Sequence, residues 1–307
     1  MALGRLLVVG GTGFIGRHIC CAALKLGYAV TSLSLQTTST QISGIEYLYA
    51  DCSDPGALST ALARKPFDFV VNCGGYIDHR LFRDGGERIL KTHFDAVVAL
   101  TSALDRQSLK RFVQVGSSDE YGTAPAPQVE SERESPISPY SLAKVAATHF
   151  LQMLWRTERF PAVTMRLFLT YGPGQATSRF LPQVVCGCLT NSVFPVSEGS
   201  QLRDFCHVSD VVRGILQSLG AKDVCGTVIN LASGVPQSVR SVVDQVRVIA
   251  GGGHPHYGQI PFRADENMAL FADILKAEAL LSWKPEIMLA DGLQDTINFY
   301  REQIHEC

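Results

Sequence analysis

The sequence predicts an α/β protein built on a parallel β-sheet with helices on both faces. Short runs rich in valine, isoleucine and leucine alternate with longer helical stretches, and a glycine-rich turn directly follows the first run. Strands that are apolar on both sides are typical of parallel sheets buried between helices. With 307 residues, of which 46% are hydrophobic, the chain can also form a large core.

The first half of the chain supplies most of the expected elements. Strands are predicted where short runs are rich in β-branched and aromatic residues, over residues 5–9, 29–35, 68–72, 111–115 and 162–168. Helices are predicted over the longer stretches at 17–26, 90–104 and 140–157. Gly27 stands just past the first of these helices, as expected beyond a helix C-terminus.

After residue 171 the pattern changes to shorter elements separated by proline and glycine. Residues 205–219 are expected to contain a helix that begins near Val208, residues 292–304 to form an amphipathic helix, and residues 254–267 to be irregular. The run 228–232 is expected to return to the sheet as a strand. We therefore expect a sheet domain over 1–169 and a smaller lobe over 170–307.

Composition and charge exclude several classes of protein. Lysine and arginine number 27 against 29 aspartates and glutamates, and this net charge of -2 excludes a globally basic surface for nucleic acid. No apolar run reaches the ~18 residues that a membrane span needs, and the N-terminus does not resemble a signal peptide. Nine cysteines without a C-x-x-C pair favour free thiols in the cytoplasm and provide no metal site.

The segment after the first strand is Gly10-Gly11-Thr12-Gly13-Phe14-Ile15-Gly16, in which three glycines have the spacing G-x-x-G-x-x-G. A tight turn from strand to helix requires a residue without Cβ, and a helix N-terminus attracts phosphate through its free amides and dipole. Because this turn lies between a predicted strand and a predicted helix, it predicts a Rossmann-type, doubly wound sheet that binds a dinucleotide.

The second strand ends without the carboxylate that usually holds the ribose of NAD. Ser34 stands at about that position, and Arg17, at the start of the first helix, is the available cation. Without a negative charge there, a 2′-phosphate is not repelled. The sequence therefore favours NADP, with NAD as the alternative.

Tyr140 and Lys144 are four residues apart in a predicted helix, so their side chains lie on one face. A nearby ammonium is expected to lower the pKa of the tyrosine, which is otherwise ~10, and so make it an acid or base. Ser117 follows the strand 111–115, at the sheet edge where parallel sheets place their chemistry. The three residues are therefore the candidate catalytic group.

The sequence resembles the extended short-chain dehydrogenase/reductase family, also called the NAD-dependent epimerase/dehydratase family. The resemblance rests on the glycine motif, on Ala50-Asp51-Cys52, on Ser117-Ser118-Asp119-Glu120-Tyr121-Gly122 and on Ser138-Pro139-Tyr140-Ser141-Leu142-Ala143-Lys144. It implies NAD(P) held by the glycine motif, with Asp51 near the adenine and Cys52 beside it, and a catalytic triad of Ser117, Tyr140 and Lys144. It also implies a nucleotide-sugar substrate bound mainly by the smaller lobe, and a homodimer.

Within this family the string Gly116-Ser117-Ser118-Asp119-Glu120-Tyr121-Gly122 is most similar to nucleotide-4-keto-6-deoxyhexose 4-reductases. The resemblance therefore implies reduction of a C4 ketone in deoxysugar biosynthesis. One alternative is a 4-epimerase or 4,6-dehydratase that recycles bound NAD. A second is a non-catalytic NAD(P)-binding sensor or scaffold, against which the intact triad argues.

The remaining candidates are substrate contacts. Arg203 and Arg263 are expected to bind the diphosphate, because a guanidinium matches phosphate oxygens in a bidentate way, and Arg179 is a third candidate. Ser118, Asp119 and His79 are expected near the sugar. Leu169 and the segment Thr92-His93-Phe94-Asp95-Ala96 depart from the family, which commonly has asparagine at one position in each place.

Overall fold

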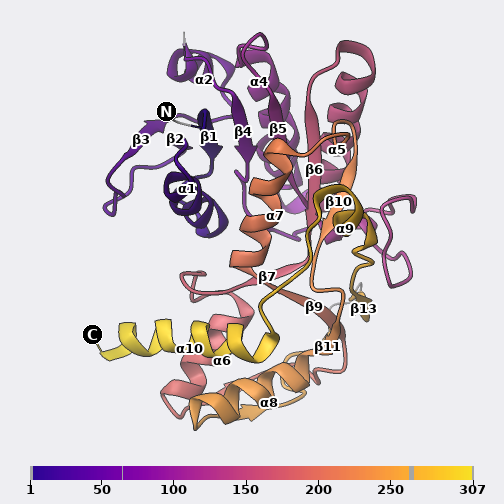
Figure 1. Ribbon diagram of the computed structural model, residues 1–307. Helices are drawn as coiled ribbons and strands as arrows, with labels where there is room; N and C mark the ends of the chain where they lie inside the picture. The colour runs from indigo at the N-terminus through magenta and orange to yellow at the C-terminus, as the bar shows by residue number, and fades with distance from the viewer. Residues whose placement is uncertain (1–2, 64, 263–265, 306–307) are drawn as a thin grey trace.

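The computed structural model describes residues 3–63, 65–262 and 266–305, and its centre is a seven-stranded parallel sheet (Figure 1). The strands are ordered β10-β6-β5-β4-β1-β2-β3, and every neighbouring pair is parallel. They are β1 (Arg5–Val9), β2 (Ala29–Ser34), β3 (Ile45–Tyr49), β4 (Phe69–Asn72), β5 (Arg111–Ser117), β6 (Ala162–Leu167) and β10 (Val228–Leu231). The predicted fold class is confirmed.

Alternate residues of each central strand enter two different cores, as the period of two in a strand requires. Leu6 and Val8 of β1 pack with helices α1 (Phe14–Leu26) and α7 (Val208–Gly220) on one face. Leu7 and Val9 pack on the other face with α2 (Pro55–Leu62), α4 (Ala96–Ala103) and α5 (Pro139–Glu158). Figure 1 shows α7 crossing in front of the sheet.

Turns between these elements shape the site. The stretch predicted as one helix over 90–104 consists of α3 (Gly86–Leu90), a π-helical turn (Lys91–Asp95) and α4. Short 3₁₀ turns lie at Phe82–Asp84 and Ser118–Tyr121. Ser138 caps α5 by accepting a hydrogen bond from the Ser141 amide, and Pro139 occupies the first turn, where its missing N–H costs nothing.

The second lobe lies below the main sheet in Figure 1 and combines small sheets with helices. Its strands are β7 (Leu169–Tyr171), β8 (Val193–Pro195), β9 (Leu202–His207), β11 (Pro236–Ser238), β12 (His254–His256) and β13 (Ala269–Leu270). Helices α6 (Phe180–Leu189), α8 (Val239–Ala250) and α10 (Leu289–His305) pack together in a third core, and the short α9 (Leu275–Leu281) contacts β10. As expected, β10 returns to the main sheet.

Several sequence expectations need correction. The strand β3 and the helix α2 were not predicted, because β3 is a half-buried edge strand and α2 has only eight residues. The helix expected to begin near Val208 does so, as α7 directly after β9, whereas a short strand, β12, interrupts the stretch expected to be irregular. Among the described residues, no helix is long and apolar enough to cross a bilayer.

Candidate active site

The glycine motif lies where the sheet order reverses, because β1 has β2 on one side and β4 on the other. Gly10 has a φ of +77°, and a Cβ there would lie 2.9 Å from the backbone of Gly74, which follows β4. A Cβ on Gly16 would lie 2.1 Å from the Gly10 carbonyl oxygen. Helix α1 begins after Gly13, whose position has no capping side chain. These features fit a pyrophosphate at the helix N-terminus.

The residues predicted for the adenosine end lie beyond the carboxyl ends of β1, β2 and β3, outside the main cavity. The Ser34 hydroxyl accepts hydrogen bonds from the amide and hydroxyl of Thr12, at 3.3 and 3.0 Å. Arg17 is exposed and donates to the Thr40 hydroxyl. Asp51 accepts two hydrogen bonds from Ser53, and burial raises the pKa of the half-buried Cys52 to about 11.

The predicted triad converges at the carboxyl end of β5. Tyr140 and Lys144 lie one turn apart on α5 and are each 5% exposed, and Ser117 ends β5. The Lys144 ammonium donates to the Val115 carbonyl at 2.9 Å and lies 5.8 Å from the centre of the Tyr140 ring. The Ser117 hydroxyl accepts a hydrogen bond from the Asp119 amide at 3.2 Å. The spacing argument therefore placed these side chains correctly.

The electrostatics of the triad differ from the sequence-based expectation. Burial, and then the negative charge of Asp119, raise the pKa of Tyr140, whereas the Ser117 hydroxyl and the Arg179 charge act in the opposite direction. Burial also lowers the pKa of Lys144, against the effect of nearby Glu120. The expectation that Lys144 lowers the tyrosine pKa is wrong for this arrangement, because desolvation of the phenolate dominates.

A cavity of about 690 Å³ joins the glycine motif to the triad and extends to the second lobe. Its walls include the predicted residues Gly10, Gly13, Phe14, Ile15, Gly16, His79, Ser117, Ser118, Asp119, Tyr140, Lys144, Arg179 and Arg203. Residues far apart in the sequence thus share one space, which is within the size range of small-molecule sites.

The three arginines predicted to bind phosphate differ in their surroundings. Arg179 is half-buried at the start of α6 and lines the cavity. Arg203 also lines it, but its guanidinium pairs with Glu266 and donates to the carbonyls of Leu202 and Asn267. Arg203 is therefore part of the contacts that hold this wall of the cavity. Arg263 lies outside the described residues.

Histidine 93 is a cavity residue to which the sequence argument gave no role. It lies on the π-helical turn, is 3% exposed, and its ring meets the Tyr140 ring at a centroid distance of 5.0 Å. Burial and the charge of Lys144 lower the pKa of His93 to about 3, so the ring is neutral. The sequence signal that could have identified His93 is its place in the segment 92–96, which departs from the family pattern.

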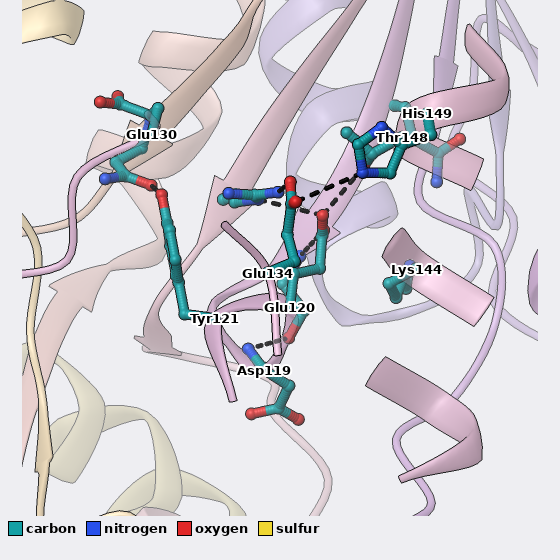
Figure 2. A network of polar contacts seen from close by, with 12 residues as sticks. Asp119, Glu120, Tyr121, Glu130, Glu134, Lys144, Thr148 and His149 are labelled. Carbon is teal, nitrogen blue, oxygen red and sulfur yellow. Dashed lines mark hydrogen bonds and ion pairs between the residues drawn. The ribbon is translucent and has the colours of Figure 1, made fainter. Parts of the chain in front are cut away.

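A buried ionic network supports the Ser117 turn (Figure 2). Glu120 accepts from the Ser117 amide at 2.9 Å, from the Thr148 hydroxyl at 2.9 Å and from Arg166 at 3.0 Å. Arg166 and Glu120 are both fully buried, and the guanidinium also pairs with Glu134. The network fixes the Ser117 amide, while Figure 2 shows the Asp119 carboxylate pointing away from the network.

Fold and site together define an enzyme of the dinucleotide-dependent dehydrogenase/reductase type. A glycine motif at the point where strand order reverses, with serine, tyrosine and lysine in the same cavity, is the arrangement that such chemistry requires.

The chain belongs to the NAD dependent epimerase/dehydratase family, whose model matches residues 6–232. It is 27% identical to a dTDP-glucose 4,6-dehydratase of Streptomyces niveus, over 97% of this chain and 93% of the relative. Among solved structures, an epimerase from Methanothermobacter thermautotrophicus has a TM-score of 0.91 at 22% identity, covering 99% of this chain and 94% of the other.

A further similar structure is a UDP-glucuronic acid 4-epimerase from Bacillus cereus in complex with UDP-glucuronic acid and NAD. Its TM-score is 0.86 at 24% identity, with 97% of this chain and 99% of the other covered. The family predicted from the sequence is confirmed. The named relatives are dehydratases and epimerases, so the finer likeness to 4-reductases stays a prediction.

Proposed function

We propose that the chain acts at C4 of a nucleotide-linked hexose in a reaction that consumes no external reductant, as a 4-epimerase or 4,6-dehydratase does. The observation that carries this proposal is the position of Tyr140, which shares one cavity with Ser117, Lys144 and the glycine motif. Relatives with dehydratase and epimerase names, matched along nearly the whole chain, support it over the 4-ketoreductase.

Each residue of the triad has a separate task in this reaction. A bound nicotinamide supplies the hydride acceptor. Tyr140 exchanges the proton of the C4 hydroxyl as the ketone forms, and Ser117 donates a hydrogen bond to the same oxygen. Because burial favours the neutral phenol, Tyr140 would act as the base only while the positive charges of an oxidised nicotinamide and of Lys144 favour its phenolate. Lys144 is fixed by the Val115 carbonyl and keeps further N–H groups for the hydroxyls of the cofactor ribose. Arg179, which lines the cavity at the start of α6, is the residue that we expect to bind the diphosphate.

The substitution Tyr140→Phe tests this assignment. We expect turnover to fall by about a hundredfold or more, because the proton acceptor is lost, while the dinucleotide still binds. The measurement is conversion of UDP-glucose, dTDP-glucose and UDP-glucuronic acid, followed by NMR, together with titration of the cofactor. Tyr28→Phe is the matched control. Tyr28 precedes β2, at the amino ends of the parallel strands, whereas the site lies at their carboxyl ends. Unchanged turnover in Tyr140→Phe would contradict the mechanism.

The second candidate is the 4-ketoreductase predicted from the sequence. It is favoured by one observation: Ser118 stands between Ser117 and Asp119, so this turn presents one carboxylate to the cavity. A reductase consumes one reduced nicotinamide per product, whereas an epimerase or dehydratase consumes none. Measuring reduced cofactor against product therefore separates the two.

We also propose NADP as the preferred dinucleotide. Ser34 provides no carboxylate at the end of β2, and the exposed guanidinium of Arg17 lies near this end, where it bonds Thr40. The B. cereus epimerase contains NAD, so the preference has to be measured on this chain. The measurement is the affinity for NAD and NADP of the wild type and of Arg17→Ala, which is expected to lose affinity for NADP selectively.

A further inference from the structure

We propose that the buried Glu120 is a positioning residue, whose carboxylate ties Ser117 to the catalytic face of α5 and whose negative charge holds Lys144 in the ammonium form. The catalytic face is the side of α5 that carries Tyr140 and Lys144 one turn apart. This inference rests on the proposed function, because it assumes that these side chains act at C4. It extends that function, since Glu120 is fully buried and acts through other residues rather than on the substrate.

The carboxylate of Glu120 joins three elements of the site. Its Oε1 accepts a hydrogen bond from the Ser117 amide at the end of β5, at 2.9 Å. Its Oε2 accepts from the Thr148 hydroxyl on α5 at 2.9 Å and from Arg166 on β6 at 3.0 Å (Figure 2). Thr148 lies one helical turn after Lys144, so the two side chains share the catalytic face. The carboxylate therefore fixes the end of β5 relative to this face of α5.

Three donors on one side chain require a carboxylate at this position. The amide, the hydroxyl and the guanidinium all donate to Glu120, and a carboxylate has two accepting oxygens where a glutamine has one. A Cβ on Gly116 would lie 2.5 Å from Oε1 of Glu120, so a side chain on the residue before Ser117 would displace the carboxylate. The Ser117 hydroxyl accepts from the Asp119 amide and keeps its own proton for a ligand.

The charge of Glu120 also acts on Lys144. Burial lowers the pKa of Lys144, and the negative charge of Glu120 is the largest effect in the opposite direction. Lys144 also lies near Cys73, His93 and Asp119. Burial raises the pKa of the Cys73 thiol to about 12 and lowers that of His93 to about 3, so both are neutral. The Asp119 side chain is 28% exposed and screened by water, so the buried Glu120 is the stronger partner.

The guanidinium of Arg166 does not cancel this charge. It pairs with Glu134 as well as with Glu120, so two carboxylates share one cation. The exposed His149 lies on the Glu134 side of this network, 3.3 Å from that carboxylate. The network therefore keeps negative charge near Lys144, which the ammonium balances.

The substitution Glu120→Gln tests both tasks, because it keeps the shape of the side chain but removes its charge and one accepting oxygen. Without this charge the pKa of Lys144 falls further, and the pKa of Tyr140, which Glu120 raises, falls as well. Both limbs of the pH profile of kcat/KM should then move to lower pH, by about one unit. We also expect kcat to fall by up to about a hundredfold while KM changes little, since Ser117 is displaced.

Further variants separate the position of the side chains from their charge. Thr148→Val removes the hydroxyl that binds Glu120 but keeps the carboxylate, so kcat should fall while the pH optimum stays. Thr148→Ser, which keeps a hydroxyl, is expected to recover most of the rate. Asp210→Asn is the matched control for a buried carboxylate, because Asp210 pairs with Arg213 on α7 at 2.6 Å. Its loss should lower the free energy of unfolding without moving the pH optimum.

A readout without substrate distinguishes failure of this inference from failure of the proposed function. In the full-length protein with isotope-labelled lysine, the Cε signal of Lys144 is identified by its loss in Lys144→Met and followed by NMR as the pH is raised. We expect this signal to titrate at lower pH in Glu120→Gln than in the wild type or in Asp210→Asn.

The role given to Glu120 is wrong if Glu120→Gln leaves the titration of Lys144 unchanged and loses the same fraction of its rate at every pH. Failure of the proposed function has a different signature. In that case the wild type leaves UDP-glucose and dTDP-glucose unconverted, while the titration of Lys144 still moves in Glu120→Gln and supports the charge assigned to Glu120.

Discussion

Burial determines the charge state of the side chains around Tyr140. The pKa of Tyr140 is raised and those of Lys144 and His93 are lowered, and in each case burial is the largest cause. Each shift disfavours the charged form, as expected where water is excluded. The cavity therefore favours the neutral phenol and the neutral imidazole.

His93 makes the stability of the protein depend on pH. Its pKa is lowered from 6.5 to about 3 in the folded chain, so below pH 6.5 the unfolded chain binds a proton that the folded chain does not. The free energy of unfolding should therefore decrease as the pH falls from 6.5 toward 3. His93→Asn should remove up to about 1.4 kcal/mol per pH unit of this slope.

Urea unfolding at several pH values within that range measures the slope. The control is His254→Asn, because His254 is exposed in β12 and should leave the slope unchanged. Parallel pH dependence in the wild type and His93→Asn would contradict the assignment of the slope to His93.

The sequence predicted that Ser117, Tyr140 and Lys144 lie close together, but it did not predict the direction in which the pKa of Tyr140 is shifted. Helical spacing alone places Tyr140 and Lys144 on one face, and the motif order places Ser117 beside them. Spacing carries no information on burial, on the ring of His93 against Tyr140, or on the contact of Asp119 with His79. These depend on which loops the fold brings together. Burial, and then the charge of Asp119, reverse the expected shift of the tyrosine pKa.

Among the elements, the turn from β1 into α1 is constrained by close backbone contact. A Cβ on Gly16 would lie 2.1 Å from the Gly10 carbonyl oxygen and 2.8 Å from the Gly11 Cα, so the helix could no longer approach the turn. We expect Gly16→Ala to abolish dinucleotide binding and to lower the thermal midpoint. Gly220→Ala is the matched control, since a Cβ at this α7 residue meets nothing within 4 Å.

Calorimetry and cofactor titration on the two alanine variants measure these effects. Gly220→Ala is expected to keep full binding and to be neutral or slightly stabilising, because alanine favours the helix. Retained dinucleotide affinity in Gly16→Ala would show that the turn tolerates the extra atom.

A buried ion pair joins β6 to the turn that follows β5. Arg166→Met leaves the fully buried Glu120 without its cation, and removing one partner of a buried pair costs about 3–5 kcal/mol. Lys65→Met is the control at the exposed pair with Glu46, where about 1 kcal/mol or less is expected. The free energy of unfolding in urea measures both, and equal losses would contradict the role given to Arg166.

At the scale of the whole molecule, the two halves of the sequence share a core. Val208 and Trp283, from the second half, pack in the same cluster as Leu6 and Ile19 from the first, and Trp283 is fully buried. Residues on the two sides of the predicted division at residue 169 therefore pack in one hydrophobic core. The sequence did indicate that the run 228–232 returns to the sheet, but it could not show that α7 closes one face of it.

We therefore expect a single cooperative unfolding transition. In a Trp155→Phe variant, Trp283 is the remaining tryptophan, and its fluorescence should change at the same temperature as the far-UV circular dichroism. Calorimetry should give one peak. Two separated transitions would mean that the lobes unfold independently, in disagreement with the shared core.

The position of β10 has a consequence for how the protein is made. This strand lies at the edge of the sheet next to β6, yet about sixty residues of the chain separate the two, including α6 and α7. While the chain emerges from the ribosome, the edge of β6 and the apolar face later covered by α7 stay unprotected until residues 208–231 have been synthesised. The nascent chain is thus most exposed to aggregation, and most in need of a chaperone, during that interval.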